Sequence, residues 1–414
     1  MFLHKKSAQA PVKRLKTAVK LDFGASGEDL RSSCNALKDG KRIVSRFLRR
    51  EKIFFCEPWQ TVAANGDLVY VTCEEGLYSM RGSAMYWLSD DASHKGCGCV
   101  YRGDFVFSAK EMGTYFLTYN RAHQVYEKGF SSLTVCADRI FGLSDNEVYY
   151  TVAGERDGWA DGEMITLPTS CDALVTVGDK VYVLGNTCYS ISPKADDIEF
   201  KCNVLAKNIG AVSTCSPVTY NGSAVFASSN GLYEICLDKI TPIFTQLCDA
   251  IDFSTAVGAM FEGKYYVSCR SKNSGEQGND VTLILDLEEE EIAGVFDIGF
   301  DSMCPIVGTI YAVHDGHFYW ITDGKAQGRF VKSKIDFGTK SKKFLDRLTV
   351  TTLNDLDVTI RSESETRLYK IKGKKTAQKI NLRDMGWEFS IKLTSNDGLD
   401  VENVELEAHV CEEV

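Results

Sequence analysis

The sequence predicts an all-β protein: an irregular six- or seven-bladed β-propeller, followed by a C-terminal antiparallel β-sandwich and preceded by an extended basic N-terminal arm. Three observations support this prediction. A short strand-and-turn phrase recurs along most of the chain, helical periodicity is nearly absent, and Lys and Arg residues are concentrated near the N-terminus. Radial repetition of small sheets leaves few open sheet edges, which favours a propeller over a series of sandwiches.

The repeated phrase consists of a small polar turn with Gly, a Val/Tyr/Phe-rich strand, a second Gly turn and an aromatic-bearing strand. It recurs roughly every 35–50 residues, a period typical of arrays in which each unit is one small antiparallel sheet. The clearest copies cover residues 65–78, 178–191 and 221–235, and partial copies cover 103–107, 262–267 and 315–321. Turns such as Asn65-Gly66, Asn221-Gly222 and Asn230-Gly231 suit tight hairpins.

Three regions follow from these patterns: an arm and lead-in segment at 1–50, a propeller at 51–330 and a sandwich at 331–414. The propeller divides into units near 52–95, 96–130, 131–170, 171–213, 214–252, 253–301 and 302–330. Residues 281–296 predict one long hairpin that turns at Glu288–Glu291. Cleaner alternation at 345–351, 357–361, 367–371, 387–393 and 404–410 predicts strands with one solvated face.

The arm is the candidate partner-binding segment. Residues 1–50 hold thirteen Lys and Arg against four Asp and Glu, whereas the whole chain has a net charge of −10. A basic segment on an acidic body indicates docking on an acidic surface or on nucleic acid, and a solvated tail is the alternative. The candidate residues are Lys5, Lys6, Lys13, Arg14, Lys16 and Lys20.

Most of the fifteen cysteines lie singly within apolar strand patterns, no CxxC pair occurs, and the one close pair is Cys97-Gly98-Cys99. Free thiols that act as small hydrophobic side chains explain this pattern best. They favour synthesis in a reducing cytosol. The sequence has no secretory signal pattern at its start and no run of about 18 apolar residues, so we expect no membrane contact.

No catalytic constellation stands out, so we expect a protein that is not an enzyme and has no cofactor and no metal. His314 and His317 flank a hairpin turn, where such residues are usually solvated. The acidic, Gly-rich segment 155–163 lacks the ligand spacing of an EF-hand and predicts an ordinary loop. A carboxylate pair of the glycosidase type stays open as the enzyme alternative, because the chain has many Asp and Glu residues.

Both ends of the chain resemble virion β-propeller proteins of tailed bacteriophages, of the tail-hub or tail-nozzle type. The resemblance lies in residues 19–24 and 30–37, in 334–338 with 342–347, and in 386–393 with 404–407. These motifs are loose and non-catalytic, and the chain is shorter than the nozzles of short-tailed phages.

The resemblance implies a non-enzymatic structural protein, made in the host cytoplasm and located in the virion tail or at the head–tail junction. It implies a homo-oligomeric ring that retains and conducts the genome, with portal, adaptor or tail subunits as partners and passing contact with genomic DNA. The alternatives are an intracellular β-propeller interaction scaffold and a propeller glycosidase-type enzyme.

Overall fold

The chain consists of two compact units whose residues interleave in the sequence. The computed structural model describes residues 14–23, 27–45, 47–51, 59–82, 84–90, 95–192, 200–272, 274–275, 277–306, 308–323 and 326–411. Unit 1 comprises residues 1–24, 28–46 and 325–414, and unit 2 comprises residues 25–27 and 47–324. Most of the segment predicted as an arm is thus grouped with the C-terminal region.

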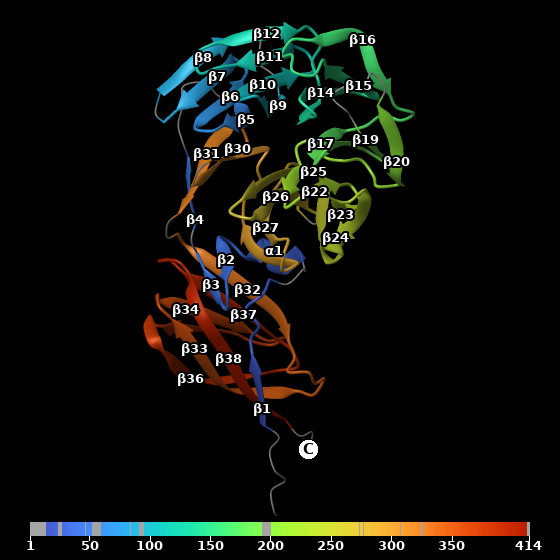
Figure 1. Ribbon diagram of the computed structural model, residues 1–414. Helices are drawn as coiled ribbons and strands as arrows, with labels where there is room; N and C mark the ends of the chain where they lie inside the picture. The colour runs from blue at the N-terminus through green and yellow to red at the C-terminus, as the bar shows by residue number, and fades with distance from the viewer. Residues whose placement is uncertain are drawn as a thin grey trace, which may run out of the picture. The chain divides into compact units, whose positions relative to one another are not determined.

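In its described residues, unit 2 has seven successive sets of four paired antiparallel strands, six of which are separate four-stranded sheets. The unit is therefore all-β and propeller-like, as predicted (Figure 1). Each of the seven ranges proposed from the sequence contains consecutive strands of one sheet. The first four sheets are β5–β8 (Trp59–Asn65, Leu68–Cys73, Gly76–Arg81, Ala84–Ser89), β9–β12 (Cys97–Tyr101, Asp104–Ala109, Gly113–Leu117, Ala122–Tyr126), β13–β16 (Ser132–Cys136, Arg139–Ser144, Glu147–Thr151, Trp159–Thr166) and β17–β20 (Ala173–Val177, Lys180–Leu184, Thr187–Ser192, Lys201–Lys207). The others are β21–β24 (Val218–Tyr220, Ser223–Ser228, Gly231–Cys236, Lys239–Ile243), β25–β28 (Ile251–Phe261, Lys264–Ser271, Val281–Asp286, Glu291–Phe296), and β29–β31 (Ser302–Ile306, Thr309–His314, His317–Asp323) with β4 (Phe47–Glu51).

The seventh sheet takes its outer strand from the beginning of unit 2. Strand β4 pairs antiparallel with β31, with Leu48 opposite Thr322 and Arg50 opposite Trp320. Residues 47–50, predicted as the end of the arm and lead-in segment, thus form part of a strand of unit 2. This segment belongs to the sheet through backbone pairing with β31. In the sequence it resembles a basic tail, because it contains Arg49 and Arg50.

The hydrophobic core of unit 2 lies between consecutive sheets. The second strand of a sheet is mostly buried, and β22 is buried along its whole length, because both faces of an inner strand are covered. One cluster joins the third and fourth sheets through Phe141 and Val181. Another joins the first and seventh sheets through Val71 and Phe318.

Unit 1 contains two antiparallel sheets. In one, β38 (Asp400–Val410) is a central strand, and β33 (Lys343–Thr352) pairs with one of its edges. Its other edge pairs with β1 (Arg14–Ala18) along one part and with β3 (Arg42–Val44) along another. The sheet continues with β36 (Lys374–Gly386), which pairs with β33, and with β2 (Ala36–Asp39), which pairs with β3. The other has the order β32 (Gly328–Ile335), β37 (Phe389–Ser395), β34 (Leu356–Arg361), β35 (Thr366–Ile371). Burial alternates along β34 and β37, the pattern of sheets that each cover a core with one face.

Helical structure is minor in the described residues. It consists of α1 (Gly27–Ser32) and the 3-10 turn η1 (Thr245–Leu247). Neither is long and apolar enough to span a membrane.

Candidate functional site

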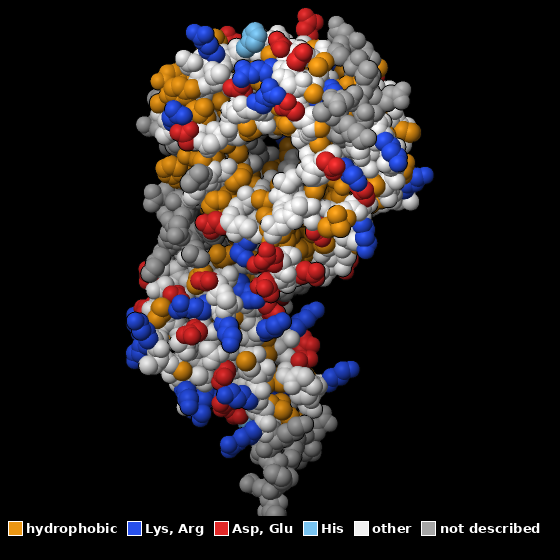
Figure 2. Space-filling view, in the orientation of Figure 1, with side chains coloured by type: hydrophobic (Ala, Val, Ile, Leu, Met, Phe, Trp, Pro, Cys, Tyr) orange, Lys and Arg blue, Asp and Glu red, His pale blue; other side chains and the backbone are white. Residues whose placement is uncertain are grey.

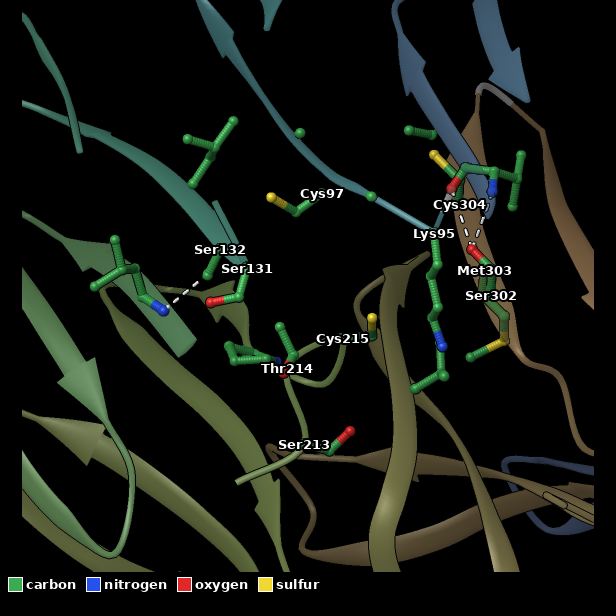
Figure 3. A pocket seen from close by; sticks show the side chains of 18 of the residues that line it. Lys95, Cys97, Ser131, Ser132, Ser213, Thr214, Cys215, Ser302, Met303 and Cys304 are labelled. Carbon is green, nitrogen blue, oxygen red and sulfur yellow. Dashed lines mark hydrogen bonds between the residues drawn. The ribbon is translucent and has the colours of Figure 1, made fainter. Parts of the chain in front are cut away.

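Unit 2 encloses a cavity of about 700 Å³ where the first strands of its sheets converge. Its wall takes residues from β5, β13, β17, β25 and β29, and from the segments just before β9 and β21. Figure 2 shows a hollow at the centre of this unit, and Figure 3 shows the labelled side chains around the cavity. A cavity of this volume, lined by several strands, is a natural place to look for chemistry.

Hydroxyl side chains in the cavity wall are bonded to the protein framework. Ser132 Oγ accepts a hydrogen bond from Leu174 N of the next sheet at 2.9 Å. Ser302 Oγ accepts from Val62 N at 3.1 Å and donates to Val62 O at 3.3 Å, which links the seventh sheet to the first (Figure 3). These hydroxyls therefore hold neighbouring sheets together, and their bonding capacity is largely used.

Thiols form a second group in the wall. Cys97 Sγ lies 3.6 Å from Ser108 O of its own sheet and 3.5 Å from Phe130 O, in the segment that leads into the third sheet. Burial raises the pKa of the Cys97 thiol well above its usual range and raises the pKa of Cys304 to about 12. Thiols in this state are neutral at physiological pH and are poor nucleophiles and poor metal ligands.

The charged side chains of the cavity wall, among the residues described, are Lys95 and Lys110, and no Asp, Glu, Arg or His lines it there. Lys95 lies beside Gly96 and Cys97 at the start of β9 (Figure 3). Across the described chain, no group of three His, Cys, Asp or Glu side chains is placed to hold a metal ion. The wall offers neutral donors and acceptors with a cationic edge.

The predicted arm residues are distributed over two environments. Lys5, Lys6 and Lys13 lie outside the described residues. Arg14 and Lys16 lie in β1, which pairs with the edge of β38. Lys20 follows that strand, and its Nζ lies 2.9 Å from Asp22 Oδ2.

Lys16 is tied to the C-terminal strand of its own unit. Its Nζ lies 2.7 Å from Glu405 Oε2. This hydrogen bond is the main reason that the pKa of Lys16 is raised and that the pKa of Glu405 is lowered. Part of the basic charge predicted for partner binding is therefore neutralised within the chain.

A buried polar motif that the sequence analysis missed recurs in the second and sixth sheets. Ser108 Oγ and Thr114 Oγ1 lie 2.9 Å apart on neighbouring strands, and Phe130 N donates to Ser108 Oγ at 2.9 Å. In the sixth sheet, Ser268 and Thr282 form the same pair, and Phe300 N donates to Ser268 Oγ. In both copies a Gly-Phe dipeptide leads into the next sheet, and this recurring dipeptide is the signal that could have identified the motif.

Comparisons with known proteins identify no family for this chain. No family model matches it, and no curated protein matches it. Similar solved structures include a chain of the Mitotic Checkpoint Complex, with a TM-score of 0.48 and 8% identity over 69% of this chain and 96% of that chain. A computationally designed protein, Ika8, gives a TM-score of 0.41 and 8% identity over 66% of this chain and 98% of that chain. PorZ of Porphyromonas gingivalis, a surface component of the type-IX secretion system, gives a TM-score of 0.45 and 8% identity over 78% of this chain and 46% of that chain. At these scores the likenesses carry no argument about function.

Proposed function

We propose that this chain is a non-enzymatic structural protein of a tailed-phage virion, located in the portal-proximal tail as part of a hub or nozzle. In this proposal, copies of the chain form a ring that retains and conducts the genome. The neighbours in the particle are portal, adaptor or other tail subunits.

The proposal includes a closed seven-bladed propeller as the body of each subunit. The pairing of β4 with β31 supports closure, because it joins the two ends of unit 2 within one sheet. The hydrogen bonds between Ser302 and Val62 and the packing of Val71 against Phe318 also link the seventh sheet to the first. Such a body is rigid, which suits a component of a particle that must hold pressure.

The observation that carries the proposal is the opposite charge of the two units. Unit 1 contains 28 Lys and Arg against 19 Asp and Glu, a net charge of +9, whereas unit 2 contains 19 against 38, a net charge of −19. Complementary surfaces on one chain favour head-to-tail contacts between copies. Head-to-tail contacts generate rings when the rotation between subunits closes.

The segments that resemble phage virion proteins give further support. They lie far apart in the sequence, yet all fall within the ranges of unit 1. Val19 N bonds to Val404 O at 2.8 Å, and Cys34 pairs with Arg329 in a bridge. Because the motifs at both ends of the chain belong to one compact unit, a common fold of that unit would explain why they occur in the same sequence.

The test is to locate the protein in purified particles. Antibodies against unit 2 are applied to DNA-filled virions after gradient sedimentation, and gold labelling is scored by electron microscopy. We expect the protein to co-sediment with particles and the label to gather at the tail end of the head. Protein that stays entirely in the soluble fraction, with unlabelled particles, would contradict the proposal and favour an intracellular scaffold.

A further inference from the structure

Unit 1 carries a pocket of about 330 Å³ on one face of the sheet β32–β37–β34–β35. Its basic wall residues are Arg329, Arg361 and Lys392, and its hydroxyl residues include Thr359, Thr366 and Ser390. All of these residues come from neighbouring strands of that sheet. A regular sheet is a more rigid platform for a binding site than a loop.

The strand register brings two of the cations close together. On the ladder between β34 and β37, Thr359 lies opposite Lys392 and Arg361 lies opposite Ser390. Arg361 and Lys392 are thus diagonal neighbours on adjacent strands. Their chain neighbours Ile360 and Ile391 are buried, whereas Arg361 and Lys392 are exposed, so both cations leave the sheet on its solvent face.

Neither cation has an acidic partner within the described part of the chain. Arg361 and Lys392 form no ion pair there, whereas Lys372 pairs with Asp355, and Arg367 pairs with Glu365. Like charges on adjacent strands repel each other, most strongly at directly opposite positions and less at diagonal ones such as these. A bound anion would offset this repulsion, because it would balance the positive charge of Arg361 and Lys392.

On the opposite side of the pocket, side chains are already hydrogen-bonded to other residues of the chain. Arg329 Nε donates to Ser32 O, and Ser333 Oγ donates to Asp29 Oδ2 at 2.9 Å. Asp29 would repel an anion, but Ser333 belongs to β32, and β37 separates that strand from Arg361 on β34. The side of the pocket formed by β34, β35 and β37 is therefore the one suited to an anion.

The donors on that side outnumber the acceptors of a carboxylate. Arg361 offers a planar fork of N–H groups, Lys392 offers an ammonium group, and Thr359, Thr366 and Ser390 offer hydroxyl groups. A carboxylate has two oxygens, whereas free phosphate has more acceptor oxygens and a greater negative charge. The backbone of a nucleic acid instead presents successive phosphodiester anions, so that each of the two cations can contact one. Arginine forks pair with phosphate in bidentate geometry.

We infer that Arg361 and Lys392, with the hydroxyl groups around them, form a binding site for a phosphoryl group, supplied by the backbone of a nucleic acid or by free phosphate. This inference goes beyond the proposed function. The site would bind phosphate whether or not the chain assembles into a virion.

The test measures binding of the full-length chain to a fluorescein-labelled DNA duplex by anisotropy, and to inorganic phosphate by calorimetry. The variant is Arg361→Gln with Lys392→Gln. The matched control is Lys374→Gln with Lys375→Gln, which removes the same charge from exposed positions of β36 in the other sheet. Thermal unfolding verifies that both variants are folded.

We expect the pocket variant to bind phosphate at least tenfold more weakly, and the control to stay within about twofold of the parent chain. If DNA is the source, the slope of log affinity against log salt should fall in magnitude by about 2 in the pocket variant, because two phosphate contacts are lost. Phosphate binding without DNA binding would assign free phosphate to the site. Equal losses in both variants, no binding of either probe, or displacement of phosphate by poly-glutamate at equal charge concentration would overturn the inference. Particle labelling is unaffected by these outcomes and tests the proposed function separately.

Discussion

Close backbone approach at single glycines controls how one sheet of unit 2 leads into the next. A Cβ atom at Gly129 would lie 1.8 Å from Ala109 O, and one at Gly299 would lie 2.1 Å from Asn279 C. Both residues precede the phenylalanines whose backbone N–H groups bond to buried serines. The Gly-Phe dipeptide is therefore a packing requirement of the repeat.

We expect Gly129→Ala to lower the free energy of unfolding of unit 2 by about 3 kcal/mol, because overpacking at backbone forces the chain to shift. Gly275→Ala is the control, since nothing lies within 4 Å of its Cβ position. Urea unfolding followed by tryptophan fluorescence measures both. Similar stabilities for the two variants would contradict the close approach at Gly129.

Partly buried thiols give a prediction with a defined pH dependence. Burial raises the pKa of Cys99 and of Cys304 to about 12, whereas Cys236 is exposed. At pH 8 only about one in 10⁴ of a thiol with that pKa is ionised, and the thiolate is the reactive form. We expect iodoacetamide to label Cys236 first, and the rates at Cys99 and Cys304 to rise about tenfold per pH unit between pH 8 and 10.

Peptide mass spectrometry of the native chain measures these labelling rates.

The raised pKa values of Cys99 and Cys304 also affect stability, because unfolding releases these thiols to ionise near their ordinary pKa of about 8.5. Their contribution to the free energy of unfolding is therefore full below about pH 8.5 and is lost as the pH rises toward 12. Equal labelling of all three cysteines at pH 8 would contradict the raised pKa of Cys99 and Cys304.

Strand β4 is the element on which the seventh sheet depends. In an antiparallel edge strand, alternate N–H groups point to the partner strand or to solvent, and proline is tolerated only at the solvent-facing positions. We therefore expect Leu48→Pro and Arg49→Pro to differ: one should lower the melting temperature of unit 2 by several degrees, and the other should be nearly neutral. Differential scanning calorimetry compares them, and equal effects would show that β4 is not paired with β31.

The strands that the sequence predicted well are the apolar ones. The hairpin expected at 281–296 is confirmed as β27 and β28, because Val281–Leu285 and Ile292–Phe296 are rich in β-branched and aliphatic residues. Strand β36 was missed, since charged and polar residues predominate in its sequence and its first four residues are all exposed. Strands β1 and β4 were missed because basic residues in them resemble a solvated tail.

The site could be predicted only in part, for a related reason. Residues of the central cavity come from several sheets, and single Ser and Cys residues carry no signal before the sheets are assembled. The pairing of Lys16 with Glu405 joins positions almost 400 residues apart and has no local signature. In contrast, the basic excess near the N-terminus was visible at once, and most of it contributes to the charge of unit 1.

Charge separation between the units makes a prediction for the whole molecule. If the basic unit of one copy contacts the acidic unit of the next, salt should weaken the contact, because the Debye length falls from about 10 Å at 0.1 M to about 3 Å at 1 M. We expect sedimentation velocity to show assembled species at low salt that dissociate as NaCl rises toward 1 M. Assembly that is unchanged or strengthened by salt would point to an apolar interface.

The most direct test of the account is cryo-electron microscopy of the virus particle, with the purified chain as the control. The account predicts a symmetric ring of this protein on the tail axis, each subunit having seven sheets closed by residues 47–51, with unit 1 of one copy contacting unit 2 of its neighbour. A particle that lacks the protein, or that carries it only as isolated copies away from the axis, would contradict the account and direct attention to ligands of the central cavity.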